Sequence, residues 1–496
     1  MKKNNHETLL FKALSFFILT LFISSTGLTQ KTYSTQNQEC FMFLVGKKAS
    51  RNGTVLLAHN NDLTGNEASH VVKYPAAVHK LTDSVRFPSG LSIPEIKQTY
   101  EWMALKIAIG FEEGDAVAIN QHGVAIAGGV ALKPDRNSLA IEKDPLIKTG
   151  LTGGVRYIAL QRSKTARECV KILGSLYSKY GVTYPSGIGI ADTSEIWYIE
   201  SGGGYSWAAV RVPDSCYWVQ ANGYRIGKVA PLDTLNYYCS PELLKFCQNN
   251  QLWNPNAGDF NFTKVFGGGR IERNEKPFYD SRRIWQAVKI FSPSLNYLFD
   301  EKEFQQFFVP DEKISLENCF SLLRNGYEET EFENNVDDLG LTGERPIASW
   351  NAVHSDVVQL YPGKPADYAA ILWTGLGPSH TCFYVPILYG VDVIHPNYHQ
   401  TEIENDGVSA FWVFHDLAQK AKNNPDFLSS IKKEQKLFEA NAIEKTNKLM
   451  LKAEKIHQLS PLHIQPLINK EVLDLCEKAY KKVKDGIEKA QGERQK

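Results

Sequence analysis

The segment from Cys40 to Asp62 constrains the fold of this 496-residue chain more than any other. It contains two apolar runs, the first opening at Cys40 and the second ending in the polar quartet His59-Asn60-Asn61-Asp62. The runs are joined at Arg51-Asn52-Gly53, and an Asn-Gly pair between apolar runs is a strong hairpin signal. The sequence therefore predicts a β-hairpin that begins with a cysteine and ends with a polar quartet.

The residues before Cys40 have the composition of a secretory leader. Lysines precede an apolar run over 13–23, and small residues of the kind that signal peptidases prefer follow at 24–27. This run is shorter than the roughly 20 residues that a membrane span needs. We expect a signal peptide over 1–30, a pro-segment over 31–39 and a secreted or periplasmic product. An uncleaved N-terminal anchor is the alternative.

A cut before Cys40 would give one residue both a thiol and a free α-amino group. A nucleophile and its base would then be attached to the same Cα, and an N-terminal-nucleophile amide hydrolase requires both groups. The pKa of an α-amine is about 8 and that of a thiol is about 8.5, so proton transfer between them costs little free energy at neutral pH. The alternative is a buried strand cysteine with no chemical role.

Composition excludes some classes of protein. Lys plus Arg and Asp plus Glu both number 55, so no net charge points to nucleic acid or to an anionic membrane. None of the eight cysteines forms a CxxC pair or a metal-ligand spacing, which gives zinc no support. Cys239 and Cys247 could form a disulfide, and buried free thiols are the equal alternative.

Short strands and flanking helices predict an α+β architecture. A helix is expected over 165–180, with Thr165 as N-cap and Gly181 as its stop. Further strands are expected at 116–120, 123–127, 187–190, 195–200, 207–212, 217–221, 357–360 and 369–373. We expect a catalytic domain over 40–414. Residues 415–496, rich in Lys, Glu, Ala and Leu, should form a helical tail that packs on the body, its charges a solvated face.

Ordered segments along most of the chain carry a family resemblance. They are Cys40 with Leu-Val-Gly-Lys-Lys-Ala, Asn52-Gly-Thr, Asn120-x-x-Gly-Val-Ala, Leu160-Gln-Arg-Ser-Lys-Thr-Ala-Arg-Glu, Trp197-Tyr-Ile-Glu-Ser-Gly-Gly-Gly, Trp207-Ala-Ala-Val-Arg-Val-Pro-Asp, Val219-Gln-Ala-Asn222, Tyr279-Asp-Ser-Arg-Arg-Ile-Trp, His354-Ser-Asp-Val-Val-Gln-Leu and Tyr384-Val-Pro. The chain resembles the bacterial dipeptidases and secernins of the cysteine-type N-terminal-nucleophile hydrolases, relatives of the penicillin V acylases and bile salt hydrolases. The resemblance implies a four-layer αββα sandwich and self-processing that exposes Cys40.

Two positions depart from the family pattern. Phe41 stands where relatives usually have Thr or Ser, and His59 stands where they have Arg in an Arg-x-x-Asp quartet. In relatives that Arg lies close to the nucleophile. His59 can carry only part of a positive charge near neutral pH, so the exchange bears on thiolate stabilisation and substrate choice.

Two residues are expected to assist Cys40. Asp62 would hold the α-ammonium group through a charge-assisted hydrogen bond, with a turn aspartate as the alternative. Asn222 would offer its amide NH2 to the developing oxyanion, with a plain Asn-Gly turn as the alternative.

Arg282 and Arg283 are candidates for binding a substrate carboxylate through a bidentate fork. A structural ion pair is the equal alternative for both. His59 is a further candidate for substrate contact, whereas His354 and His380 have no recognisable partner and are interpreted as structural.

These residues predict a secreted cysteine dipeptidase that needs no cofactor and no metal. Its partners would be small peptides or N-acyl amino acids, and a homo-oligomer is left open. One alternative is an N-acyl amino acid amidase of the penicillin V acylase type. The other is a catalytically silent secreted binding protein, suggested by the 22 Tyr, the 9 Trp and the His59 departure.

Overall fold

The computed structural model describes residues 39–109, 112–114, 117–132, 139–267, 278–301, 303–339, 342–459 and 464–493. The chain divides into Met1–Asn37 and Gln38–Lys496, and every described residue belongs to the second unit. The predicted signal peptide and all of the predicted pro-segment except Glu39 therefore lie outside the described residues.

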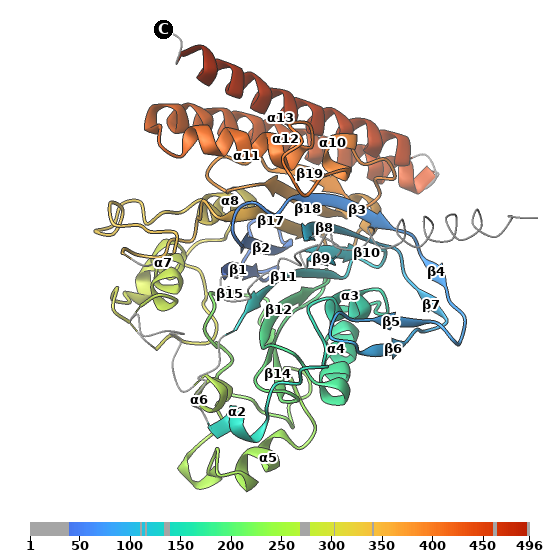
Figure 1. Cartoon of the computed structure of the whole chain (residues 1–496), viewed down its shortest axis with the longest axis vertical. Coiled ribbons are helices and arrows are strands. Elements are labelled where there is room, and N and C mark those ends of the chain that lie inside the picture. Colours follow the sequence, from blue (N-terminus) through green and yellow to red (C-terminus); the bar gives the residue numbers. More distant parts are fainter. Residues whose placement is uncertain are drawn as a thin grey trace, which may run out of the picture. The chain divides into compact units, whose positions relative to one another are not determined.

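The first sheet has six antiparallel strands in the order β15-β1-β2-β17-β18-β19 (Figure 1). The strands are β1 (Glu39–Val45), β2 (Val55–Asp62), β15 (Tyr217–Gln220), β17 (Ala352–Leu360), β18 (Ala370–Leu376) and β19 (Val385–Leu388). Every residue of β2 and β17 is buried, because these central strands are covered on both faces. The predicted hairpin is present, with Gly53 at a φ of 68° in its turn, a conformation that glycine adopts without strain.

The second sheet has nine antiparallel strands in the order β16-β14-β13-β12-β11-β10-β8-β3, with β9 paired to β8. The strands are β3 (Ser69–Tyr74), β8 (Trp102–Ile109), β9 (Glu112–Gly114), β10 (Ala118–Asn120), β11 (Ala125–Ala131), β12 (Ser186–Ala191), β13 (Ile196–Ser201), β14 (Trp207–Val212) and β16 (Tyr237–Cys239). It packs face to face on the first sheet: Gly189 of β12 lies directly against the side chains of Leu44 and Met42 of β1.

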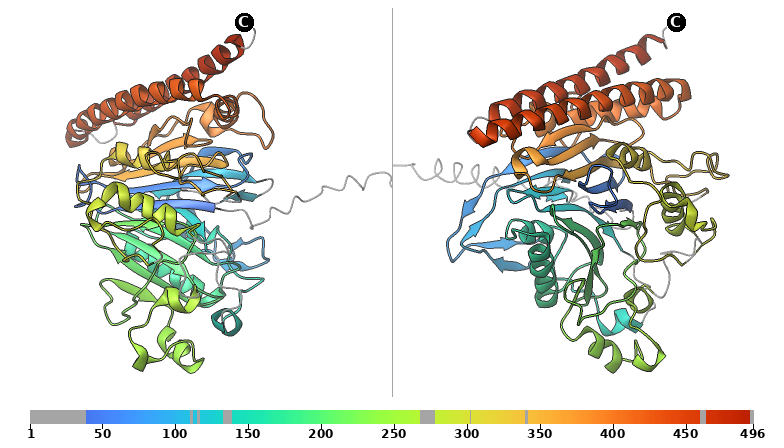
Figure 2. Two further views of the ribbon diagram at one scale, coloured as in Figure 1. Left: turned by 90° about the vertical axis from the view of Figure 1, so that its left-hand side faces the viewer. Right: turned by 180° about the vertical axis from the view of Figure 1, so that it is seen from behind.

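Helices cover the outer face of each sheet (Figure 2). The second sheet carries α3 (Val155–Leu160) and α4 (Ala166–Tyr180). The first sheet carries α8 (Leu316–Leu323), α11 (Ala410–Ala421), α12 (Pro425–Leu459) and α13 (Gln465–Glu493). The predicted four-layer αββα sandwich with C-terminal helices is therefore confirmed.

The remaining elements are short. They are α2 (Leu139–Lys143), α5 (Leu243–Asn249), α6 (Phe262–Phe266), α7 (Ser281–Phe291), α9 (Ala366–Ala369), α10 (Pro396–His399), η2 (Pro255–Ala257), η3 (Pro293–Leu295) and the paired strands β4 (Ala77–Val78) with β7 (Gln98–Thr99) and β5 (Ser84–Arg86) with β6 (Ser92–Pro94).

Local signals explain where α4 begins and ends. The Thr165 side chain accepts a hydrogen bond from the backbone N–H of Glu168, which caps the helix start. Gly181 follows the helix at a φ of 68°. The predicted boundary between residues 414 and 415 falls inside α11, so the helical region starts slightly earlier than expected.

Two further sequence expectations concern cysteines and the membrane. All eight cysteines are free thiols, including Cys239 and Cys247, so the disulfide alternative does not apply. In the part of the chain that the structure describes, none of the helices combines the length and the apolar character that crossing a membrane requires.

Candidate active site

The pairing of β1 with β2 places the polar quartet beside Cys40. In this antiparallel register Cys40 lies opposite Asn61, and Glu39 lies opposite Asp62. The Cys40 side chain is only 2% exposed. Cys40 is the second residue of β1, so the buried thiol lies at the end of the β1–β2 pair that is opposite the turn.

Groups from three other segments contact Cys40. Its Sγ lies 3.7 Å from Oδ1 of Asn61, and its backbone nitrogen donates to Oδ1 of Asn222 at 3.3 Å. The carbonyl oxygen of Cys40 accepts a hydrogen bond from Arg283 at 3.1 Å. Asn222 follows β15, and Arg283 lies on α7, so distant parts of the sequence converge on one residue.

The surroundings of Cys40 favour the protonated form of its thiol. Burial raises the pKa of Cys40 to about 12, and the negative charge of Asp62 acts in the same direction. The backbone N–H of Asp62 and the positive charges of Arg156 and Arg283 act in the opposite direction. A base close to the sulfur is therefore needed before Cys40 can act as a nucleophile near neutral pH.

A buried network orients Asn222. Arg283 donates to Oδ1 of Asp280 at 2.6 Å and to Oδ1 of Asn222 at 3.2 Å. The backbone N–H of Asn222 donates to the same Asp280 oxygen at 3.2 Å. Because the amide oxygen of Asn222 is held by Arg283 and by the Cys40 nitrogen, its NH2 group points away from these two donors.

The two adjacent arginines have different surroundings. Arg283 is fully buried, and its donors go to the Cys40 carbonyl, Asn222 and Asp280. Arg282 forms an ion pair with Glu344, and its guanidinium lies 4.1 Å from the centre of the Phe332 ring. These contacts correspond to the structural ion pairs that the sequence left as an alternative, and they place only Arg283 at Cys40.

Asp62 also has a partner that the sequence did not indicate. Its carboxylate forms a buried ion pair with Arg345. The backbone N–H of Asp62 lowers the pKa of the Cys40 thiol, whereas the charge of its carboxylate raises it. An α-ammonium group on Cys40 would therefore share the Asp62 carboxylate with Arg345.

His59 lies in a buried cluster with His354 and Asp356. Nδ1 of His354 is 2.9 Å from Oδ2 of Asp356, and Nδ1 of His59 is 3.7 Å from the same oxygen. Nε2 of His354 is 3.2 Å from Nδ2 of Asn61, whose Oδ1 lies beside the Cys40 sulfur. The Asn61 side chain therefore connects the cluster with Cys40. Burial lowers the pKa of His59, although its contact with Asp356 acts in the opposite direction.

The sequence predicts only a structural role for His354, because nothing near it in the sequence identifies a partner. Residues two apart on a strand share a face, so His354 and Asp356 project together from β17. The pairing of β17 with β2 then sets them opposite Asn61 and His59. His380, in contrast, stacks on Trp350 at 4.2 Å.

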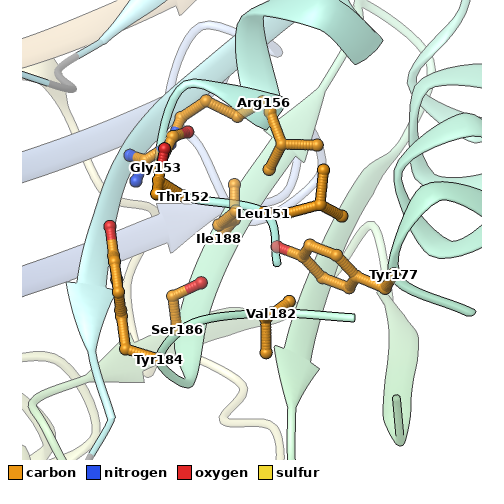
Figure 3. A pocket seen from close by; sticks show the side chains of 10 residues that line it. Leu151, Thr152, Gly153, Arg156, Tyr177, Val182, Tyr184, Ser186 and Ile188 are labelled. Atoms are coloured by element: carbon orange, nitrogen blue, oxygen red, sulfur yellow. The ribbon is translucent and has the colours of Figure 1, made fainter. Parts of the chain in front are cut away.

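A pocket opens beside α3. It is lined by Leu151, Thr152, Gly153, Val155, Arg156, Tyr177, Val182, Tyr184, Ser186 and Ile188. Arg156, Thr152 and Tyr184 lie on one side of it, and Leu151 and Tyr177 on the other (Figure 3). A Cβ atom at Gly129 would overlap the guanidinium of Arg156, and one at Gly128 would overlap the ring of His59. Two neighbouring glycines of β11 thus let both side chains approach the strand.

Comparison with known proteins identifies the family. The model of "Peptidase family C69" matches residues 39–438. A "Probable dipeptidase" of Salmonella dublin is 28% identical over 364 residues, covering 72% of this chain and 82% of the relative. A "Probable dipeptidase" of Latilactobacillus sakei is 28% identical over 388 residues, covering 76% and 80%. The chain therefore belongs to peptidase family C69, and it is a hydrolase.

Among solved structures, a mutant of the conjugated bile acid hydrolase from Clostridium perfringens is similar to this chain. It is 10% identical, it covers 68% of this chain and 89% of its own length, and its TM-score is 0.28.

Proposed function

We propose that this protein is a secreted cysteine dipeptidase, whose nucleophile Cys40 becomes the N-terminal residue by self-cleavage of the bond after Glu39. One observation carries the proposal. The backbone nitrogen of Cys40 lies within hydrogen-bond distance of Asn222, and the Cys40 sulfur lies beside Asn61, in a site enclosed by buried charges. Freeing this nitrogen would place an amine base next to the buried thiol.

The reaction can be written with these groups. The α-amine takes the thiol proton, and the sulfur forms a bond to the carbonyl carbon of the substrate. The NH2 group of Asn222 stabilises the oxyanion, a contribution commonly worth several kcal/mol. The amine leaving group takes the proton back as the C–N bond breaks, which leaves a thioester. Water then attacks the thioester with the α-amine as base, releasing the acid and restoring the thiol.

The burial of Cys40 supports a precursor that does not hydrolyse dipeptides. In self-cleavage the thiol attacks the Glu39 carbonyl carbon of its own chain, its proton passes to the Cys40 nitrogen as the C–N bond breaks, and water hydrolyses the resulting thioester. The thiol stays protonated while its nitrogen belongs to a peptide bond, because burial raises its pKa to about 12. After cleavage, the same residue carries an α-amine with a pKa of about 8, which can accept the thiol proton. We infer that cleavage, rather than a change of fold, switches hydrolysis on.

A dipeptide substrate is supported by the names of the relatives, which are probable dipeptidases that match most of this chain. Secretion is supported by the basic, apolar and small-residue sequence of positions 2–27. The pocket beside α3 offers Arg156 and hydroxyl groups for polar parts of a small substrate.

Hydrolysis assays on the purified secreted protein test the proposal. We expect unprotected dipeptides to be cleaved, and Cys40→Ala to remove this activity. A protein that cleaves N-acyl amino acids but no dipeptide would be an amidase of the acylase type. A protein that cleaves neither, although its N-terminus is Cys40, would contradict an enzymatic role for this site.

A further inference from the structure

The buried cluster of His59, His354 and Asp356 has the composition of a cation site. All three side chains are fully buried. One ligand atom from each residue, a ring nitrogen or a carboxylate oxygen, lies within 4.8 Å of the other two. A tetrahedral metal about 2.1 Å from each ligand atom sets these atoms about 3.4 Å apart, so the side chains would have to close by up to about 1.4 Å to bind it.

Three polar atoms of the cluster take part in no hydrogen bond within the described residues. Among the described residues, no hydrogen bond reaches either ring nitrogen of His59, and Oδ1 of Asp356 is likewise without one. Native proteins satisfy nearly all buried polar atoms, and a buried group without a protein partner calls for a water, an ion or a functional reason. Oδ1 of Asp356 and one of the two ring nitrogens of His59, on facing residues of β2 and β17, could share one occupant.

We propose that His59, His354 and Asp356 bind one divalent transition-metal cation, and that Zn²⁺ satisfies this site. Two imidazoles and one carboxylate are a ligand set that zinc uses at sites that keep a fourth position open. Cysteine spacing predicts no zinc site in this sequence, and no local spacing reveals this one. The ligands here come from two strands that are almost 300 residues apart.

Neighbouring groups fit the outer shell of such a site. A metal-bound histidine normally donates its other ring N–H to a nearby acceptor. When Nδ1 of His354 binds the metal, its Nε2 carries the proton and faces the amide of Asn61 at 3.2 Å. The Asn61 oxygen would then turn to His354 and its NH2 to the Cys40 sulfur, where it would stabilise a thiolate. The close approach of the Gly128 backbone fixes the His59 ring from the other sheet.

The cation would also supply a missing charge. The resemblance places an Arg at position 59 in relatives, where it contributes a permanent positive charge near the nucleophile. A metal held by His59 and its two partners would restore such a charge. Metal binding itself goes beyond the proposed function, and only its effect on hydrolysis rests on that function.

Binding is tested first, without reference to activity. A chelator first removes bound metal from the processed protein, which begins at Cys40. The protein is then titrated with Zn²⁺ in competition with a chromophoric zinc indicator, and elemental analysis gives the amount of zinc bound per chain. We expect one zinc per wild-type chain and at least a hundredfold weaker binding by Asp356→Asn and His354→Gln. The matched control His380→Gln, which changes a histidine stacked on Trp350 instead, should bind as the wild type does.

Two results would overturn the proposal. Wild-type protein that retains much less than one zinc per chain has no such site, and this result needs no variant to fold. Full binding by folded Asp356→Asn places the zinc elsewhere. Co²⁺ substitution in the wild type provides a second check, because a site with these ligands gives visible absorption bands of a four- or five-coordinate ion.

The His59→Arg variant tests whether the metal affects hydrolysis through its positive charge. The readout is the ratio of the rates of dipeptide hydrolysis with and without chelator, measured within each protein. We expect a ratio of one tenth or lower in the wild type and close to one in His59→Arg, which carries its own permanent charge. An equal loss in both proteins would overturn the assignment to this cluster. Stoichiometric zinc without hydrolysis of any dipeptide would contradict the proposed function and leave the metal site standing.

Discussion

Among single residues, Cys40 is the one on which the proposed chemistry depends. We predict that Cys40→Ala loses hydrolysis entirely and changes the free energy of unfolding by only about 1 kcal/mol, because the smaller side chain leaves little unfilled volume in the core. Cys40→Ser should retain at most weak activity. Dipeptide assays and denaturant unfolding measure the two effects, and a fully active Cys40→Ala protein would remove Cys40 from the mechanism.

Asn222 is predicted to act on the transition state. Removing one oxyanion donor usually costs about a hundredfold to a thousandfold in kcat, so Asn222→Ala should lower kcat by this factor and leave KM nearly unchanged. Asn256→Ala, which removes an exposed amide far along the chain, is the control. A rise in KM at constant kcat would assign Asn222 to substrate binding.

Residue identities predicted part of this site. Cys40, Asn222 and one of two neighbouring arginines do converge. Adjacent residues on a helix point about 100° apart, and on α7 Arg283 contacts Cys40 whereas Arg282 pairs with Glu344. His354 and Arg345 were not recognised, because their partners lie on other strands and loops and no local spacing reveals them.

At the scale of elements, β3 carries a histidine that should make the fold acid-sensitive. Burial, aided by the charges of Lys106 and His399, lowers the pKa of His70 to about 4, from 6.5. The neutral ring therefore contributes stability above about pH 6.5, and this stability is lost as the pH falls, because the unfolded chain takes up the proton more readily.

We predict that His70→Gln reduces this acid sensitivity. Between pH 6.5 and 4.5 the wild type should lose about 2 kcal/mol more of its unfolding free energy than the variant does. Urea titrations at several pH values provide the measurement. Parallel stability curves for the two proteins would contradict the assignment of this effect to His70.

Most strands and α4 could be predicted because their signals are local. The N-cap and the stop of α4 are neighbours of the helix in sequence, and the Asn-Gly turn lies within its own hairpin. The order of strands in a sheet is not local. β2 pairs with β17 through residues almost 300 positions apart, and this pairing is what assembles the cluster around His59.

At the scale of the whole molecule, the C-terminal helices are bound to the catalytic sandwich by buried charges. Glu439 of α12 pairs with Arg324 and also accepts the backbone N–H of Tyr384 at 3.1 Å. Arg324 in turn donates to the carbonyl groups of Ser379 and Cys382. These contacts connect the helix to the segment between β18 and β19.

We predict that Glu439→Ala destabilises the protein by about 3 kcal/mol, because it leaves Arg324 buried without its counter-charge. Glu444→Ala, on the same helix, removes an exposed i,i+4 pair with Lys448 and should leave the free energy of unfolding nearly unchanged. Similar costs for both changes would show that the helices are a loosely attached tail.

The proposed mechanism requires Cys40 to be the first residue of the active enzyme. Mass spectrometry of the purified, active protein measures this directly, through its intact mass and the sequence of its N-terminal peptide. We predict a mature chain that begins at Cys40 with a free α-amino group, and a Cys40→Ala protein that keeps the preceding residues. A stable and fully active form that begins at Lys31 would contradict the mechanism.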